Sequence, residues 1–271
     1  MPPLVDRCER GGALMFLLWQ RHSMKKNLIL LFSIFCLVNT SLAQTKKVLI
    51  VSTNVDTIQD APNGTFLMEI AYPLAAFTKA GIEADVVTPK GGKAAIYHTN
   101  TLPDSLAAIQ QSEMFIDKTT HSLAPDQVVA FDYSGIFYPG GGGQFYDVVN
   151  NENIAKIAAR IYENRGIVGS AGHGPVSLIN IKLSDGTFLV NNKDIACFPK
   201  YASAKWLPID WEVELTKRGA KIVLPLTAVE KDKGVQLLDK KNRIISGSFA
   251  ENAEWVAEQM AILIREPDSQ R

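Results

Sequence analysis

Short runs of apolar, β-branched residues without polar alternation constrain the fold of this chain most. They cover Lys47–Asn54, Ala84–Pro89, Tyr133–Tyr138 and Gly166–Ser170. A strand buried on both faces has this pattern, whereas a strand with one wet face alternates. Segments with helical periodicity separate the runs. This order predicts a doubly wound, flavodoxin-like α/β fold, in which helices flank a mostly parallel sheet on both faces.

The helices of this fold are expected where apolar residues recur at helical spacing. Gly81 follows the first such segment, in the position of a helix C-cap. The polar stretch Lys90–Ala130 has a weaker helical pattern around Ser105–Ser112, and we expect it to form a small inserted cap. The helices are predicted over 66–80, 151–164, 210–218 and 251–264, and further short strands near 194–198, 222–224, 235–238 and 244–246. One domain is predicted over 47–264.

The residues before the first strand have the layout of a secretory signal peptide. A positive start at Met24–Asn27 precedes an apolar run, Leu28–Val38, and a small-residue ending at Ala43. The run is shorter than the ~20 residues that a membrane span needs. We therefore predict a signal peptide over 24–43, export to the periplasm or beyond, and no membrane association after cleavage. Residues 1–23 fit no part of a signal and are interpreted as an upstream extension of the gene model.

Charge and cysteine content limit the partners. The 28 Lys and Arg residues balance the 28 Asp and Glu residues, and no basic stripe with interleaved aromatic residues is present. Nucleic acid is therefore not expected as a partner. Of the three cysteines, Cys8 and Cys36 would be removed with the signal peptide. Cys197 would remain alone, and one cysteine cannot form an internal disulfide.

A glycine run follows the third apolar strand. Gly140–Gly143 would let the backbone approach a ligand closely and direct N–H groups at an anion. The run lacks the GK[ST] and G-x-G-x-x-G patterns of phosphate loops, so no nucleotide cofactor is predicted. A tight structural turn remains the alternative to oxyanion-type donation.

A second unusual turn follows the fourth apolar strand. Ser170–Pro175, called the elbow below, joins a buried strand to a helix through small residues, which is the geometry of a nucleophile elbow. The apex should carry Ser or Cys, but it carries Gly172. Ser170 is expected on the same side as Gly172 but deeper in the sheet, so we weigh it only as a minor alternative nucleophile.

Glu69 is the third candidate. It lies in an otherwise apolar helical segment, 66–73. A carboxylate there either faces solvent or points into a site with a raised pKa, and both alternatives stay open. Two weaker candidates are Cys197 as a displaced nucleophile and a metal site using His98, His121 or His173. A buried strand cysteine is usually a small hydrophobe, and the histidine spacing is not diagnostic of metal, so no metal is predicted.

Together these segments resemble the ThiJ/PfpI superfamily, within the class I glutamine amidotransferase-like fold. The nearer resemblance is to the branch of heat-shock chaperones and cofactor-independent glyoxalase III enzymes. It covers nearly all of 47–264. The matching segments are Glu69 with Pro73, Thr88–Gly92, Asp132–Tyr133, Pro139–Gly143, His173–Pro175 and Leu183–Gly186.

The resemblance implies roles for these residues. Glu69 would be the acid/base partner and His173 the triad histidine. Gly141 and Gly172 would offer N–H groups to an oxyanion, with Gly142 also at the ligand. The family cysteine would occupy the position of Gly172. The resemblance also leaves a homodimer open.

Several positions depart from the family pattern. Gly172 replaces the cysteine, and Gly142 replaces a frequent histidine. Pro199–Ser203 lacks the acidic pair that would supply the third triad member, and Gly247–Ala250 replaces the usual Gly-Gln-Asn-Pro. The fold elements persist, so this pattern suggests a site that has changed or lost its chemistry.

Two hypotheses about function follow. In the first, the protein is a ligand-binding or chaperone-like pseudoenzyme without covalent cysteine catalysis, with a small carbonyl-type compound as a possible ligand. In the second, it is an active glyoxalase III-like, deglycase-like or other lyase or hydrolase enzyme. That enzyme would act on small carbonyl compounds such as methylglyoxal and use Glu69 and His173 as a general acid/base pair.

Overall fold

The computed structural model describes residues 46–99, 101–205 and 207–266. The predicted signal peptide over 24–43 and the extension over 1–23 lie outside the described residues. Cys8 and Cys36 lie outside them as well.

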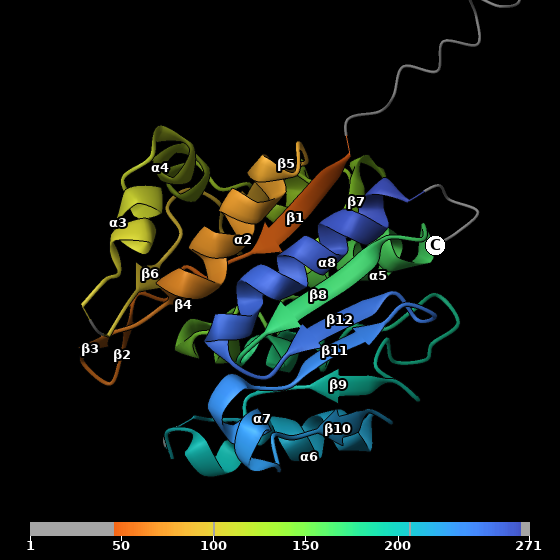
Figure 1. Ribbon diagram of the computed structural model, residues 1–271. Coiled ribbons are helices and arrows are strands. Elements are labelled where there is room, and N and C mark those ends of the chain that lie inside the picture. The colour runs from red at the N-terminus through yellow and green to blue at the C-terminus, as the bar shows by residue number, and fades with distance from the viewer. Residues whose placement is uncertain (1–45, 100, 206, 267–271) are drawn as a thin grey trace, which may run out of the picture. The chain divides into compact units, whose positions relative to one another are not determined.

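A six-stranded sheet has the strand order β11-β12-β8-β7-β1-β5 (Figure 1). Neighbouring strands are parallel except for β11, which pairs antiparallel with β12 at one edge. The predicted mostly parallel sheet is therefore confirmed. Its strands are β1 (Lys47–Val51), β5 (Glu83–Val87), β7 (Tyr133–Tyr138), β8 (Ile167–Ala171), β11 (Gln236–Asp239) and β12 (Ile244–Gly247).

Helices cover both faces of this sheet. On one face α2 (Leu67–Lys79) packs against α8 (Ala253–Arg265), and on the other lies α5 (Glu152–Glu163) (Figure 1). Strand β1 explains the missing polar alternation. Its residues Val48 and Ile50 belong to the core beneath α2 and α8, and Leu49 and Val51 belong to the core on the α5 side. Burying each such side chain contributes about 1.5–3 kcal/mol, so neither face tolerates a polar residue.

The inserted segment between β5 and β7 contains two helices rather than one. The expected helix near 105–112 is α3 (Asp104–Gln110), and α4 (Glu113–Thr120) follows it. We did not predict α4, because it buries only Phe115 and Thr119 and so lacks an apolar stripe. A local cap starts it instead: the Ser112 hydroxyl accepts a hydrogen bond from the Phe115 N–H at 3.2 Å.

The helices at the carboxyl half also depart from expectation in one place. The predicted helix over 210–218 is α6 (Trp211–Lys217), but α7 (Ala228–Lys233) was not predicted. Its six residues bury none of their side chains, so no apolar periodicity marks it. A reciprocal capping box between Thr227 and Glu230 starts this helix.

Three short strand pairs are also present in the described part of the chain. They do not join the main sheet. Within the described residues, no helix is long and apolar enough to cross a membrane. The pairs are β9 (Asp194–Ala196) with β10 (Lys221–Val223), β2 (Thr57–Ile58) with β3 (Ala61–Pro62), and β4 (Thr65–Phe66) with β6 (Ile96–Tyr97).

Candidate functional site

Helix α2 and the loops after β7 and β8 bring three predicted site elements together. The Gly140 N–H, after β7, donates to Oε2 of Glu69 at 2.5 Å. A Cβ atom added at Gly172, after β8, would lie 2.6 Å from Oε1 of the same carboxyl group. The Glu69 carboxyl group therefore lies between two glycines, on the side of the sheet where parallel strands end.

Burial decides between the two alternatives for Glu69. Only 3% of the residue is exposed, so it does not face solvent. Loss of solvation raises the pKa of its carboxyl group to about 8, against the opposing effect of the Gly140 hydrogen bond. The negative charge of Glu251 adds to the increase. At neutral pH the group is mostly protonated, which makes it a hydrogen-bond donor as well as an acceptor.

Gly172 has the backbone of a sharp elbow but not the donor expected of it. Its φ of +52° lies in the left-handed region, which glycine adopts without strain. Its N–H donates to the Gly247 carbonyl at 3.0 Å. The prediction that Gly172 offers this N–H to an oxyanion is therefore wrong. The helix expected after the elbow is a 3₁₀ helix, Gly174–Leu178, too short to carry much of a helix dipole.

The glycine run after β7 packs closely against the chain around β4. Gly141 has a φ of +116°, and an added Cβ would lie 2.2 Å from the Gly64 carbonyl oxygen. The N–H of Gly141 donates to no acceptor among the described residues, so it remains a candidate donor to a ligand. The N–H of Gly142 faces the hydroxyl of Tyr97. Gly142 therefore contacts the side chain of Tyr97, which we had not predicted at the site.

Tyr97 and Asn63 are the residues that sequence analysis missed. The pKa of Tyr97 is raised by burial and then by the charge of Glu69, which places the phenol near that carboxyl group. Its ring packs edge-on against Phe66, with centroids 5.5 Å apart. Asn63 is 7% exposed, and its Oδ1 accepts from the Gly64 N–H. Both lie in segments without a motif, and only the pairing of β4 with β6 brings Tyr97 here.

His173 lies in an aromatic surrounding rather than beside an acid. Its ring is 4.6 Å from the Phe198 ring and 5.2 Å from the Trp211 ring, centroid to centroid. Nε2 lies 3.0 Å from the Ser203 hydroxyl, which itself donates to the Pro199 carbonyl. Ser203 therefore accepts from Nε2–H. Burial lowers the pKa of His173 to about 4, so the imidazole is neutral at pH 7.

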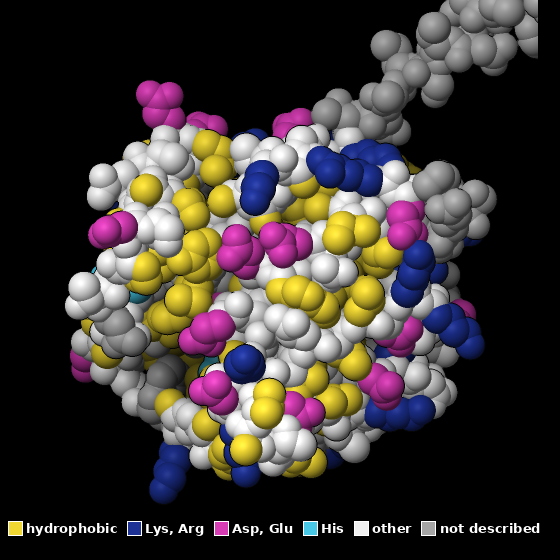
Figure 2. Space-filling model, viewed as in Figure 1, with side chains coloured by type: hydrophobic (Ala, Val, Ile, Leu, Met, Phe, Trp, Pro, Cys, Tyr) yellow, Lys and Arg dark blue, Asp and Glu magenta, His cyan; other side chains and the backbone are white. Residues whose placement is uncertain are grey.

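An apolar surface adjoins this site. Figure 2 shows hydrophobic side chains gathered where α2 meets the inserted segment of α3 and α4. Partly buried hydrophobic residues of these segments pack on the core beneath α2 and α8. They include Met68, Tyr72, Ile96, Leu102, Ile109 and Met114.

Neither alternative nucleophile is accessible. Ser170 is fully buried, and its hydroxyl has no hydrogen-bond partner among the described residues. Cys197 is also fully buried, and burial raises the pKa of its thiol to about 12. The thiolate is the reactive form of cysteine, so this residue is a core side chain.

Cys197 should therefore resist modification in the folded protein. We expect iodoacetamide to leave a chain shortened by residues 1–43, in which Cys197 is the sole cysteine, unlabelled in the native state at pH 8 and to label it fully in denaturant, as measured by intact mass. An exposed-cysteine variant, Ser184→Cys, is the positive control. Rapid labelling of this shortened chain in its native state would contradict the burial of this thiol.

The histidines do not form a metal site in the described part of the chain. No group of three or more His, Cys, Asp or Glu side chains in 46–99, 101–205 and 207–266 is arranged to hold a metal ion. His121 is exposed and lies 3.0 Å from Asp117 on the same helix.

Comparison with known proteins gives consistent relatives. The chain is 25% identical over 241 residues to the glutathione-independent glyoxalase hsp3102 of Schizosaccharomyces pombe, covering 80% of this chain and 97% of the relative. It is 32% identical over 149 residues to the probable glutathione-independent glyoxalase SNO4 of Saccharomyces cerevisiae, covering 51% and 61%.

Solved structures share the fold. The Rapid Encystment Protein of 24 kDa from Francisella tularensis superposes with a TM-score of 0.72 at 22% identity, over 82% of this chain and all of the other. Glyoxalase III of Candida albicans superposes with a TM-score of 0.64 at 20% identity, over 81% and 98%. The sequence profile of the DJ-1/PfpI family matches residues 58–220, more than half of the chain. The chain therefore belongs to the DJ-1/PfpI family.

Proposed function

We propose that this protein binds small carbonyl compounds non-covalently at the Glu69 site and does not perform thiol chemistry there. The observation that carries the proposal is the position of the Glu69 carboxyl group, which fills the space where a side chain at residue 172 would begin. Relatives named as glutathione-independent glyoxalases support the substrate class. Covalent attack on an aldehyde needs a nucleophile, and Gly172 has none.

The carboxyl group suits a carbonyl oxygen as its ligand. A protonated carboxyl group donates one hydrogen bond, and a carbonyl oxygen accepts. Two further donors lie nearby. The Gly141 N–H follows Gly140, which donates to Glu69, and the Tyr97 hydroxyl is near enough to Glu69 for the charge of that carboxyl group to raise its pKa. A buried donor that is left without a partner costs about 1–3 kcal/mol, so a ligand oxygen that satisfies one is bound correspondingly more tightly.

The alternative, general acid/base catalysis by Glu69 and His173, is not favoured by the geometry. The Glu69 carboxyl group contacts Gly140 and Gly172, whereas the imidazole bonds to Ser203, so the two side chains share no hydrogen bond. A histidine with a pKa of about 4 is also a weak base at neutral pH.

Binding of hydroxyacetone, a stable analogue of methylglyoxal, tests the proposal. We expect saturable binding by calorimetry at pH 6.5, with no change in intact mass. Glu69→Leu should weaken binding about tenfold or more, since the loss of one hydrogen bond in a buried site is worth about 1.4 kcal/mol or more. Affinity should also fall as the pH rises through 8, because a deprotonated carboxylate cannot donate.

The matched control is Glu254→Leu, which removes an exposed carboxylate from α8. It should leave hydroxyacetone binding unchanged. A covalent adduct on the natural chain, or equal binding by natural protein and Glu69→Leu, would refute the proposal.

A further inference from the structure

A groove lies over the amino-terminal end of α5, away from the Glu69 site. Its volume is about 480 Å³, within the range of small-molecule sites. It shares no lining residue with the candidate site described above. The side chains that give it its chemistry are Asn150, Lys156, Asn180, Lys182, Phe188 and Arg218.

A tight hairpin places two of these side chains next to each other. Residues Lys182 and Phe188 pair as an antiparallel bridge, and the Leu183 N–H donates to the Thr187 carbonyl inside it. The Lys182 ammonium lies 5.2 Å from the centre of the Phe188 ring. The Arg218 guanidinium lies 5.2 Å from the same ring. The ring thus holds two cations at one groove by cation–π attraction.

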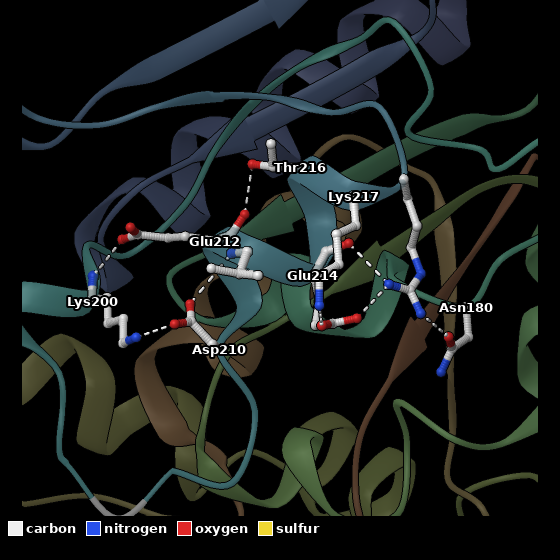
Figure 3. Close-up of polar contacts among 9 residues, drawn as sticks. Asn180, Lys200, Asp210, Glu212, Glu214, Thr216 and Lys217 are labelled. Atoms are coloured by element: carbon white, nitrogen blue, oxygen red, sulfur yellow. Dashed lines mark hydrogen bonds and ion pairs between the residues drawn. The ribbon is translucent and has the colours of Figure 1, made fainter.

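Arg218 is held in place by hydrogen bonds, but one of its donors has no partner among the described residues. Nη1 donates to Glu214 at 2.7 Å, and Nη2 donates to Oδ1 of Asn180 at 3.1 Å (Figure 3). Its Nε is buried and has no partner among the described residues. Asn180 in turn donates to the Val149 carbonyl at 3.0 Å, which orients the amide. A guanidinium held in this way presents a rigid donor surface.

The charge of the groove favours an anion. Three cations, Lys156, Lys182 and Arg218, line it together with one carboxylate, Glu152, and a second carboxylate, Glu214, pairs with Arg218 at 2.7 Å. Lys156 pairs with Glu152 at 3.3 Å, whereas Lys182 forms no ion pair with a carboxylate of the described residues. The twelve-residue helix α5 also begins here, and its amino-terminal end adds positive potential.

We propose that this groove is a second ligand site, which binds a small organic oxyanion, a carboxylate or a phosphate ester. Lys182 and Arg218 would contact the oxyanion, and the Phe188 ring would pack against the apolar part of the ligand. The side chains of Asn150 and Asn180 would supply polar contacts at the rim. The site is independent of the carbonyl site at Glu69.

Titration at low ionic strength tests this proposal with two probes, succinate for the carboxylate and glycerol phosphate for the phosphate ester. We expect saturable binding of at least one probe, followed by calorimetry and by chemical shifts of the groove amides. The preferred probe identifies the oxyanion. Lys182→Met should weaken binding about tenfold, and raising the salt from 20 to 200 mM should weaken it further, because the attraction is partly screened.

Two further variants make the result specific. Arg218→Lys keeps the charge but removes the planar fork, and we expect it to weaken binding more than threefold. Lys231→Met removes an exposed charge from α7 and should change nothing. Thermal unfolding verifies that each variant is folded. The proposal is overturned if neither probe binds at 10 mM, or if Lys231→Met weakens binding as much as Lys182→Met does.

Discussion

Replacing Glu69 with glutamine should remove most of the loss of stability that we expect this protein to undergo as the pH rises from about 4.5 to 8. The folded state holds the proton of Glu69 to about pH 8, whereas the unfolded chain releases it near 4.5. Between these values the folded state binds more protons than the unfolded state, so the free energy of unfolding falls as the pH rises. Each pKa unit corresponds to 1.36 kcal/mol, and the total loss is on the order of 5 kcal/mol.

His173 acts in the opposite direction on the acid side. Its pKa is about 4 in the folded state and 6.5 in the unfolded chain, so stability is lost as the pH falls from 6.5 toward 4. The natural protein should therefore be most stable near pH 5–6.5. Glutamine keeps an oxygen to accept from the Gly140 N–H, but it cannot ionise. The alkaline slope should disappear in Glu69→Gln while the acid slope remains.

Urea unfolding at pH 5.5, 7 and 9 measures the effect. At pH 9, Glu69→Gln should be more stable than the natural chain by several kcal/mol. At pH 5.5, one unit above the pKa in the unfolded chain, the difference should shrink to about 1.4 kcal/mol. Glu254→Gln makes the same chemical change at an exposed position of α8 and should retain the natural slope. Parallel pH profiles for the natural chain and Glu69→Gln would mean that the carboxyl group is not held protonated.

The central sheet could be predicted from sequence because its signal is local. The run at β1 lacks polar residues since both of its faces are buried, and the pattern shows this directly. Helices α4 and α7 could not be predicted in this way. They bury two side chains and none, respectively, and depend on the caps at Ser112 and Thr227.

The candidate site could be predicted only in part from the sequence, for a related reason. Glu69 and the glycine turns follow strands or lie in an apolar helix, so their composition is conspicuous. Tyr97 reaches the site through the pairing of β6 with β4, a contact between distant segments that no local pattern encodes. The prediction that the Gly172 N–H faces a ligand was wrong because the carbonyl of Gly247, at the end of strand β12, accepts its hydrogen bond.

Introducing a thiol at the elbow should restore covalent chemistry. The backbone at Gly172 already has the left-handed conformation of an elbow apex, with a φ of +52°. A cysteine in this left-handed conformation would be strained by about 1–3 kcal/mol. Its Cβ would lie 2.6 Å from Oε1 of Glu69. That oxygen is at the end of a flexible side chain, which can move away. The sulfur would then lie beside a carboxyl group able to move protons.

We expect Gly172→Cys to convert methylglyoxal to lactate at least 100-fold faster than the natural chain, since removing a nucleophile typically costs such factors or more. Gly172→Ala places the same strain at the elbow without sulfur and should remain inactive. Lactate formation measured enzymatically, with unfolding curves for both variants, separates chemistry from stability. Equal activity in the natural chain and Gly172→Cys would show that the nucleophile lies elsewhere.

The thiol alone should not recover the full rate, because the imidazole also lacks its acidic partner. Nε2 of His173 lies 3.0 Å from the Ser203 hydroxyl, so a carboxylate introduced there would face the ring directly. Ser203→Asp should raise the pKa of His173 from about 4 and so make the imidazole a better base. We expect the double variant, Gly172→Cys with Ser203→Asp, to exceed Gly172→Cys by a further tenfold. Ser203→Asp alone should stay inactive, because an acid and a histidine without a nucleophile cannot form the covalent intermediate.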